Sequence, residues 1–234
     1  MKLSRLPGDA PEIFSSIQGE GVSMGVPSVF VRLSGCNLHC AWCDTKYTWD
    51  WTQYDPQREI IVLNADDIAR RVSAAGIHNV VITGGEPLLQ QRSLGLLGSL
   101  LKDQHHRIEV ETNGTLAPKS AFAHLVDQWN VSPKLVNSGN TAVEREVPAV
   151  LSWFAAQPAA YFKFVVTDPG DLAEVDALAH RYSIPADRIL LMPEGRDPAT
   201  LTERSQWLVE RCREHGYRFT TRLHVLLWGD KRGR

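Results

Sequence analysis

Three of the four cysteines, Cys36, Cys40 and Cys43, lie within eight residues, whereas Cys212 is far along the chain. Thiolate is the soft ligand that an iron–sulfur cluster requires. Three thiolates on one tight loop can bind three irons of a cubic 4Fe–4S cluster and leave the fourth iron open to a substrate or cofactor. The cysteine spacing therefore favours a redox cluster with one vacant corner.

Two other uses of these cysteines stay open at this point. A structural zinc site is closed by four ligands, and the nearest extra candidates, His39 and Asp44, belong to the same turn as the cysteines. Three unliganded buried thiols are the other alternative. We expect Cys212, on a predicted helix, to be an inert half-buried thiol.

The elements that position this loop follow from the hydrophobic pattern. Apolar runs of strand length alternate with segments of helical periodicity, which is typical of an α/β fold with a mostly parallel sheet. We expect strands over residues 28–34, 79–83, 107–112, 130–132, 161–166 and 189–192. We expect helices over residues 64–75, 91–104, 120–126, 147–156, 171–182 and 199–215, the first capped by Asn64. Such a fold places an active site at the carboxyl ends of the strands, where the cysteine loop follows the first strand.

Length and charge bound the possible functions. The 234 residues, with 43% hydrophobic and 22% charged side chains, predict one folded domain over residues 1–234. A net charge of −2 argues against nucleic-acid binding by bulk counterion release. The chain contains no apolar run of membrane-spanning length and no signal-peptide segment, so we expect a cytoplasmic protein that does not bind membranes.

Two segments depart from the alternating pattern. Residues 45–59 crowd tyrosine and tryptophan among polar residues, and we interpret them as an insertion loop that covers the site. Residues 219–228 are interpreted as a short C-terminal strand, followed by a basic tail that ends at Arg234.

The cysteine loop resembles the signature of the radical S-adenosylmethionine (SAM) superfamily, C-x-x-x-C-x-x-C, with the aromatic Trp42 before the third cysteine. The resemblance implies an abbreviated, open (β/α)6-type barrel. It also implies that the amino and carboxylate groups of SAM chelate the open iron, and that the reduced cluster cleaves SAM to a 5′-deoxyadenosyl radical.

The same resemblance assigns cofactor-binding roles to residues at the ends of the predicted strands. They include the G-G-E-P segment after Thr83, the S-P-K segment at residues 132–134 and the M-P-E segment at residues 192–194. The implied set is Trp42, Cys43, Asp44, Gly85, Glu86, Glu111, Asn113, Ser132, Pro133, Lys134, Met192, Pro193 and Glu194. Taken alone, G-G-E-P is also an ordinary strand-to-helix turn, and S-P-K a loop with a solvated lysine.

Glu109 and Glu111 fall on one face of a predicted strand. They face the barrel interior or, alternatively, point to solvent from an edge strand. Lys163 stands in an apolar run, and a lysine in a buried strand needs a partner. We expect that partner to be Glu109 or Glu111.

Further motifs resemble the 7-carboxy-7-deazaguanine synthases within the superfamily. They are S-I-Q-G-E-G at residues 16–21, Arg32, the Asp44–Thr45 pair, and the ending H-V-L-L-W-G at residues 224–229. The implied reaction converts 6-carboxy-5,6,7,8-tetrahydropterin to 7-carboxy-7-deazaguanine with loss of ammonia, in queuosine and 7-deazapurine biosynthesis. The implied substrate-binding residues are Ile17, Gln18, Gly19, Glu20, Arg32 and Thr83, and Thr45 is the implied magnesium ligand.

The chemistry of these side chains suits a carboxylated heterocycle. Gln18 offers a donor and an acceptor to an amide edge, Glu20 accepts from guanidine-like N–H groups, and Arg32 can grip a carboxylate bidentately. Each has an alternative in the sequence: Arg32 as a surface ion pair, Asp44–Thr45 as a cap of the turn after Cys43, and His224 as a core or interface histidine. Glu20 and His224 are the catalytic candidates.

The partners implied by the resemblance are a flavodoxin- or ferredoxin-like electron donor and a second copy of the chain in a homodimer. Two rival functions remain. One is a glycyl-radical-enzyme activating protein, which shares the cysteine loop, and the other is a non-catalytic zinc or iron–sulfur module.

Overall fold

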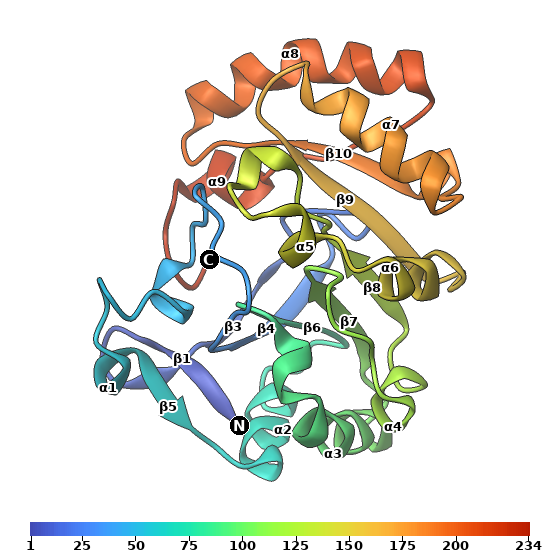
Figure 1. Cartoon of the computed structure of the whole chain (residues 1–234). Helices are drawn as coiled ribbons and strands as arrows, with labels where there is room; N and C mark the ends of the chain where they lie inside the picture. The colour runs from blue at the N-terminus through green and yellow to red at the C-terminus, as the bar shows by residue number, and fades with distance from the viewer.

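The computed structural model describes residues 1–234 and has a mostly parallel sheet that forms an open, partial barrel with helices on its outside (Figure 1). Six parallel strands follow one another in chain order and lie where the sequence predicts them. They are β4 (Pro27–Leu33), β6 (Asn79–Gly84), β7 (Arg107–Thr112), β8 (Gln128–Val131), β9 (Ala160–Val166) and β10 (Ile189–Pro193). The sheet does not close, because β11 (Arg218–Phe219) continues it beyond β10 and antiparallel strands flank β4.

All six predicted helices are present. They are α2 (Ala65–Ser73), α3 (Gln91–Asp103), α4 (Ser120–Ala123), α6 (Pro148–Ala155), α7 (Asp171–Arg181) and α8 (Pro198–His215). The Asn64 side chain accepts a hydrogen bond from the backbone N–H of Asp67 at 2.8 Å, which confirms it as the cap of α2. α4 is a single turn and ends earlier than predicted.

The strands alternate between two environments, as the period of two requires. On β9, Phe162, Phe164 and Val166 pack into the main hydrophobic core, whereas Lys163 faces the barrel interior. The same alternation recurs along the sheet, so the outward positions build the core and the inward positions are largely polar. The sheet thereby carries its functional side chains on its inner face.

Several short elements were not predicted. They are the strands β1 (Lys2–Leu6), β2 (Ala10–Pro11), β3 (Ile13–Ile17) and β5 (Ile60–Val62), the helices α1 (Pro56–Glu59) and α5 (Ala142–Arg145), and 3-10 turns at Lys46–Thr48, Pro87–Gln90, Val136–Ser138 and Ala186–Arg188. β3 pairs antiparallel with β4 over its full length and brings the start of the chain to the barrel edge. This pairing positions the residues that follow Ile17.

The predicted C-terminal strand over 219–228 is wrong. Only Arg218–Phe219 pair as a strand, and Leu223–Trp228 form the helix α9. The apolar residues here are consecutive and do not alternate, so a strand would have exposed half of them with no second sheet to cover them. In α9, Val225 is fully buried, and the helix lies beside the C-terminus (Figure 1).

No helix in the structure combines the length and the apolar character needed to cross a bilayer.

Candidate active site

A cavity of about 450 Å³ opens at the carboxyl ends of the parallel strands. Its size is typical of a small-molecule site. Nearly all the residues that the sequence singled out line it. These are Ile17, Gln18, Gly19, Glu20, Arg32, Cys36, Cys40, Trp42, Cys43, Asp44, Thr45, Thr83, Gly85, Glu111, Asn113, Ser132, Lys134, Met192, Glu194 and His224. Glu86, Pro133 and Pro193 do not line it.

The cysteine loop forms one wall of the cavity, directly after β4. The end of β6 presses on this loop: a Cβ on Gly85 would lie 2.2 Å from the carbonyl oxygen of Gly35 and 2.9 Å from the Cβ of Cys36. Only a glycine allows such an approach. The G-G-E-P segment therefore fixes the position of the first cysteine.

The cysteines fit an iron–sulfur cluster. Burial raises the pKa of the Cys36 thiol to about 12, and it also raises the pKa of Cys40, so neither is a thiolate at neutral pH without a nearby cation. No three His, Cys, Asp or Glu side chains in residues 1–234 converge to hold a single metal ion. A cube instead binds each cysteine through a different iron at a separate corner, so the trio suits a cluster better than a zinc ion.

Glu86 has a different environment from the one expected for a cofactor ligand. Its carboxylate is fully buried and accepts hydrogen bonds from the backbone N–H of Leu88 at 2.9 Å and of Asn113 at 2.7 Å. It also accepts from the hydroxyl of Thr112. Glu86 therefore ties the end of β6 to the end of β7 and leaves Gly85 to face the cavity.

The segments after β8 and β10 complete the cluster side. Lys134 donates to the hydroxyl of Ser132 at 2.8 Å, and its ammonium lies 5.6 Å from the ring centroid of Trp42. Glu194 lines the cavity and forms an ion pair with Arg204 of α8, so its carboxylate is held by that helix.

On the opposite side, Glu111 lies among the predicted substrate residues. It accepts from the Gln18 amide at 3.1 Å and from the Thr83 hydroxyl at 2.7 Å. The Gln18 oxygen in turn accepts from the backbone N–H of Glu20 at 3.2 Å. Both the nitrogen and the oxygen of the Gln18 amide are therefore hydrogen-bonded, and the amide links the Glu111 side chain to the backbone of Glu20.

Arg32 projects into the cavity from β4. Its Nε donates to Glu12 at 2.8 Å, and neither terminal nitrogen has a protein hydrogen-bond partner. Burial opposes its charge, but Tyr47 and Glu12 raise the pKa of the guanidinium above its usual range. The surface ion pair considered as an alternative does not occur, because Glu12 is fully buried.

Lys163 forms an ion pair with Glu20, and the prediction of Glu109 or Glu111 as its partner is wrong. Glu109 is fully buried and accepts from Arg107, Gln128 and Asn130 instead. β7 is a central strand, which also excludes the reading in which these acids point to solvent from an edge.

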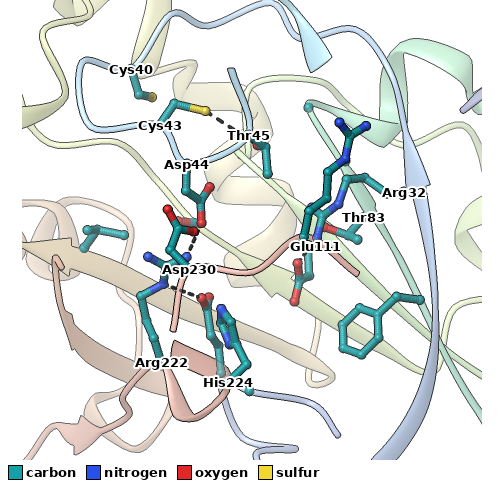
Figure 2. Close-up of a pocket in the computed structure, with 18 of the residues that line it drawn as sticks. Arg32, Cys40, Cys43, Asp44, Thr45, Thr83, Glu111, Arg222, His224 and Asp230 are labelled. Carbon is teal, nitrogen blue, oxygen red and sulfur yellow. Dashed lines mark hydrogen bonds and ion pairs between the residues drawn. The ribbon is translucent and has the colours of Figure 1, made fainter. Parts of the chain in front are cut away.

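Arg222, just before α9, joins three segments of the site and was not predicted. Its Nε donates to Glu20 at 3.1 Å, its Nη1 donates to the carbonyl of Gly195 at 2.8 Å, and its Nη2 pairs with Asp44 (Figure 2). The only signal in the sequence was an arginine two residues before His224, at the start of the terminal motif.

These charges keep Glu20 ionised although most of its side chain is buried. Burial alone would raise its pKa, but Lys163 and Arg222 together hold it well below its usual range. Arg222 likewise lowers the pKa of Asp44 against the effect of burial. Both carboxylates are therefore anions at neutral pH.

Asp44 and Thr45 do not cap the turn after Cys43, so that alternative is wrong. Asp44 pairs with Arg222, and the Thr45 side chain makes no capping hydrogen bond. The Thr45 hydroxyl lies 3.6 Å from the Cys43 sulfur and lines the cavity, where a hard oxygen ligand is available to a cation.

His224 lies on α9 and faces the cavity (Figure 2). Its ring packs against Gly19, where a Cβ would lie 2.1 Å from Nδ1. Neither ring nitrogen has a protein hydrogen bond, so His224 is not a satisfied core histidine. Burial lowers its pKa, which leaves the ring neutral at pH 7.

The C-terminal tail, residues 230–234, lines the cavity together with Tyr47, Trp49 and Tyr54 of the predicted covering loop. Arg232 anchors the tail: it donates to Glu12 at 3.0 Å and to Glu59 at 2.9 Å, and its guanidinium carbon lies 3.5 Å from the Tyr47 ring centroid. The sequence showed the tail to be basic but gave no sign that it folds back on the site.

Comparisons with known proteins agree with this geometry. Residues 30–138 match the radical SAM superfamily. The chain is 39% identical to the 7-carboxy-7-deazaguanine synthase of Pyrobaculum aerophilum, over 95% of this chain and 96% of that protein. It is also 39% identical to the synthase of Halobacterium salinarum, over 95% and 93% of the two chains. The crystal structure of QueE from Escherichia coli superposes with a TM-score of 0.70 at 26% identity, covering 96% of this chain and 95% of that one.

The position of Arg222 leads to a prediction about stability. Arg222→Met leaves the half-buried Asp44 without its partner and removes one of two cations from Glu20, so we expect the free energy of unfolding of the apoprotein to fall by about 1.5–3 kcal/mol. Arg213→Met is the matched control, because Arg213 is exposed and pairs only with Glu210 one helical turn away. It should change stability by less than about 0.5 kcal/mol. Urea unfolding measures both, and equal losses in the two variants would contradict a central role for Arg222.

Proposed function

Because the chain belongs to the 7-carboxy-7-deazaguanine synthases of the radical SAM superfamily, we propose that its cavity binds a carboxylated pterin beside SAM and a 4Fe–4S cluster. The enzyme converts 6-carboxy-5,6,7,8-tetrahydropterin to 7-carboxy-7-deazaguanine with release of ammonia, in 7-deazapurine and queuosine biosynthesis. The observation that carries the assignment of the site is that three cysteines and a free-ended arginine line one cavity.

Cys36, Cys40 and Cys43 hold the cluster in this proposal. When bound, the cluster and SAM supply the radical that abstracts a hydrogen atom from the substrate. Gly85, Asn113, Ser132 and Lys134 line the cavity on this side and orient the cofactor. Trp42, Met192 and Glu194 complete this wall, and the fully buried Glu86 supports it from behind.

The opposite wall binds the substrate. Arg32 offers two free terminal nitrogens to the substrate carboxylate, and the ionised Glu20 accepts from guanidine-like N–H groups of the ring. Phe14 and Phe30, stacked with centroids 5.1 Å apart, provide a flat apolar surface in the same cavity. Gln18 and Thr83 hold Glu111 between them, and Ile17 and Gly19 complete the contact surface.

Two residues contribute to charge and proton handling. Thr45 would supply one hard oxygen to a magnesium ion, which would add positive charge beside the substrate carboxylate. His224 is neutral at pH 7, and its unpartnered ring nitrogens can accept a proton from the substrate or donate a hydrogen bond to it.

The wider setting of the reaction is also a proposal. A flavodoxin- or ferredoxin-like protein supplies the electron in this proposal, since the family resemblance implies such a donor. The family resemblance supports a homodimer. It also supports a cytoplasmic location, and the three cluster thiols need a reducing compartment of that kind.

Turnover of the carboxypterin tests the proposal directly. The protein reconstituted under anaerobic conditions with iron and sulfide, then given reductant, SAM, magnesium and 6-carboxytetrahydropterin, should form the deazapurine and release ammonia. Absorbance and mass spectrometry detect the product. The Cys36→Ala/Cys40→Ala/Cys43→Ala variant should be inactive, whereas Cys212→Ala should keep its activity because Cys212 lies outside the cavity.

The same assay separates the rival functions. A glycyl-radical-enzyme activating protein would leave the pterin unchanged and would label a partner polypeptide. A non-catalytic module would bind the metal without cleaving SAM.

The free nitrogens of Arg32 predict a loss of carboxylate recognition. Arg32→Met removes a charge-assisted bidentate contact, worth about 1.5–3 kcal/mol, so KM should rise about 10- to 100-fold. Inhibition by a 6-hydroxymethyl analogue, which lacks the carboxylate, should change little. Steady-state kinetics measure both constants, and a parallel weakening of the two ligands would show that Arg32 does not read the carboxylate.

The lowered pKa of His224 predicts a dependence of stability on pH. Below the ordinary value of about 6.5, the unfolded chain binds a proton that the folded chain does not bind, so the wild type loses stability as the pH falls. Above this window the contribution is constant. The charged groups that face the ring are Glu20, Asp44, Glu111 and Arg222. All four are the same in the wild type and in the variant used for comparison.

Denaturation of the apoprotein from pH 5 to 8 measures this effect against His224→Asn. The unfolding free energy of the wild type minus that of the variant should fall as the pH drops below about 6.5 and should stay constant above it. A drift in the opposite direction would mean that the fold favours the protonated ring.

A further inference from the structure

Each of the three clustered cysteine sulfurs accepts a hydrogen bond from one N–H group, and the Cys43 sulfur also lies 3.6 Å from the Thr45 hydroxyl. The sulfur of Cys36 accepts from the backbone N–H of Leu38 at 3.5 Å. The sulfur of Cys40 accepts from the side-chain amide of Asn140 at 3.3 Å, and that of Cys43 from the indole N–H of Trp49 at 3.3 Å. Two of the three donors are therefore side chains from outside the cysteine loop.

Both side-chain donors are held in place by other contacts. The Asn140 oxygen accepts from the backbone N–H of His39 at 2.9 Å, and its amide also reaches the hydroxyl of Ser138 at 3.1 Å. The Trp49 ring stacks on the ring of His39, with centroids 4.7 Å apart and planes 20° apart. His39 thus contacts both donors, and neither is free to turn away from its sulfur without breaking a second contact.

From these contacts we propose that Trp49 and Asn140 are positioning residues that set the reduction potential of the cluster. The proposal rests on the proposed function, since it requires that the cysteines hold a cluster. One-electron reduction adds negative charge that spreads onto the thiolate sulfurs, and an N–H dipole aimed at a sulfur stabilises the more negative state. Each donor therefore makes the cluster easier to reduce.

The chemistry of the two donors suits this role. An indole and an amide do not titrate near neutral pH, so their effect on the sulfurs is independent of pH. They also add no net charge to a wall that already holds Lys134 near Trp42. The contribution of each donor is consequently separable from that of the surrounding ion pairs.

Redox titration of the reconstituted protein without SAM tests this role. The oxidised cluster takes one electron from a reduced viologen or dithionite, with no bond made or broken, and electron paramagnetic resonance reports the reduced fraction. We expect Trp49→Phe and Asn140→Ala each to make reduction about tenfold less favourable, a shift of about 59 mV to lower potential for one electron. The double variant should show the sum, because the donors act on different sulfurs.

Trp51→Phe is the matched control. It also replaces an indole by a phenyl ring in the covering segment, but Trp51 has no side-chain hydrogen bond and does not line the cavity. Its potential should equal that of the wild type. A general disturbance of the segment would instead shift the control together with Trp49→Phe.

The outcomes separate this inference from the proposed function. If the wild type binds four irons and cleaves SAM but the two variants keep its potential, the inference is wrong and the function stands. If Trp49→Phe loses the cluster, Asn140→Ala alone tests the inference. A lower potential supports it, and an unchanged potential contradicts it. Loss of the cluster in both variants would show that the donors retain iron and do not tune it, which also overturns the proposal. A wild type that never binds a cluster contradicts the function itself.

Discussion

The site depends on one constraint: charged recognition groups have to be buried, and a buried charge is stable only beside an opposite charge. Glu20 meets this condition through Lys163 and Arg222, which approach it from β9 and from the segment before α9. Without them, burial would favour the protonated carboxyl, and Glu20 would lose its value as an acceptor. The same guanidinium neutralises Asp44, so the substrate wall and the segment after the cluster loop share one cation.

In the proposed site, the groups for radical generation and those for substrate recognition come from partly different stretches of the chain. The stretch that matches the superfamily, residues 30–138, carries the cysteines and the G-G-E-P segment. Arg32 and Thr83 of the proposed substrate wall also lie within that stretch, whereas Glu12 and Glu20 precede it and Arg222 and Arg232, which line the same cavity, follow it. Glu12 contacts both Arg32 and Arg232, so the first and last segments meet on one buried carboxylate. The two ends of the chain thus complete the cavity that the central stretch begins.

Features that repeat along the chain or that involve neighbouring residues could be predicted from the sequence. Single contacts between residues far apart in the chain could not. The strands, the inward-facing acids and the cap at Asn64 all follow from periodicity or from neighbours along the chain. The partner of Lys163 could not be predicted in this way, because two acids on a nearby strand fitted the pattern equally well and Glu20 is 143 residues away. Arg222 was missed for the same reason: its three partners come from three separate segments. The strand expected over 219–228 failed because a run of apolar residues carries no period by itself.

The polar side chains inside the barrel hold one another in place through hydrogen bonds. Glu109, at the base of the cavity, is fully buried and is bonded to Arg107, Gln128 and Asn130 on its own and the next strand. Asn130 also lines the cavity, so the floor of the site is held by a hydrogen-bonded network whose members each have a partner. A floor of this kind cannot adjust to a ligand without leaving a buried polar group unsatisfied. In the proposed site this network therefore holds Asn130 in place before any ligand binds.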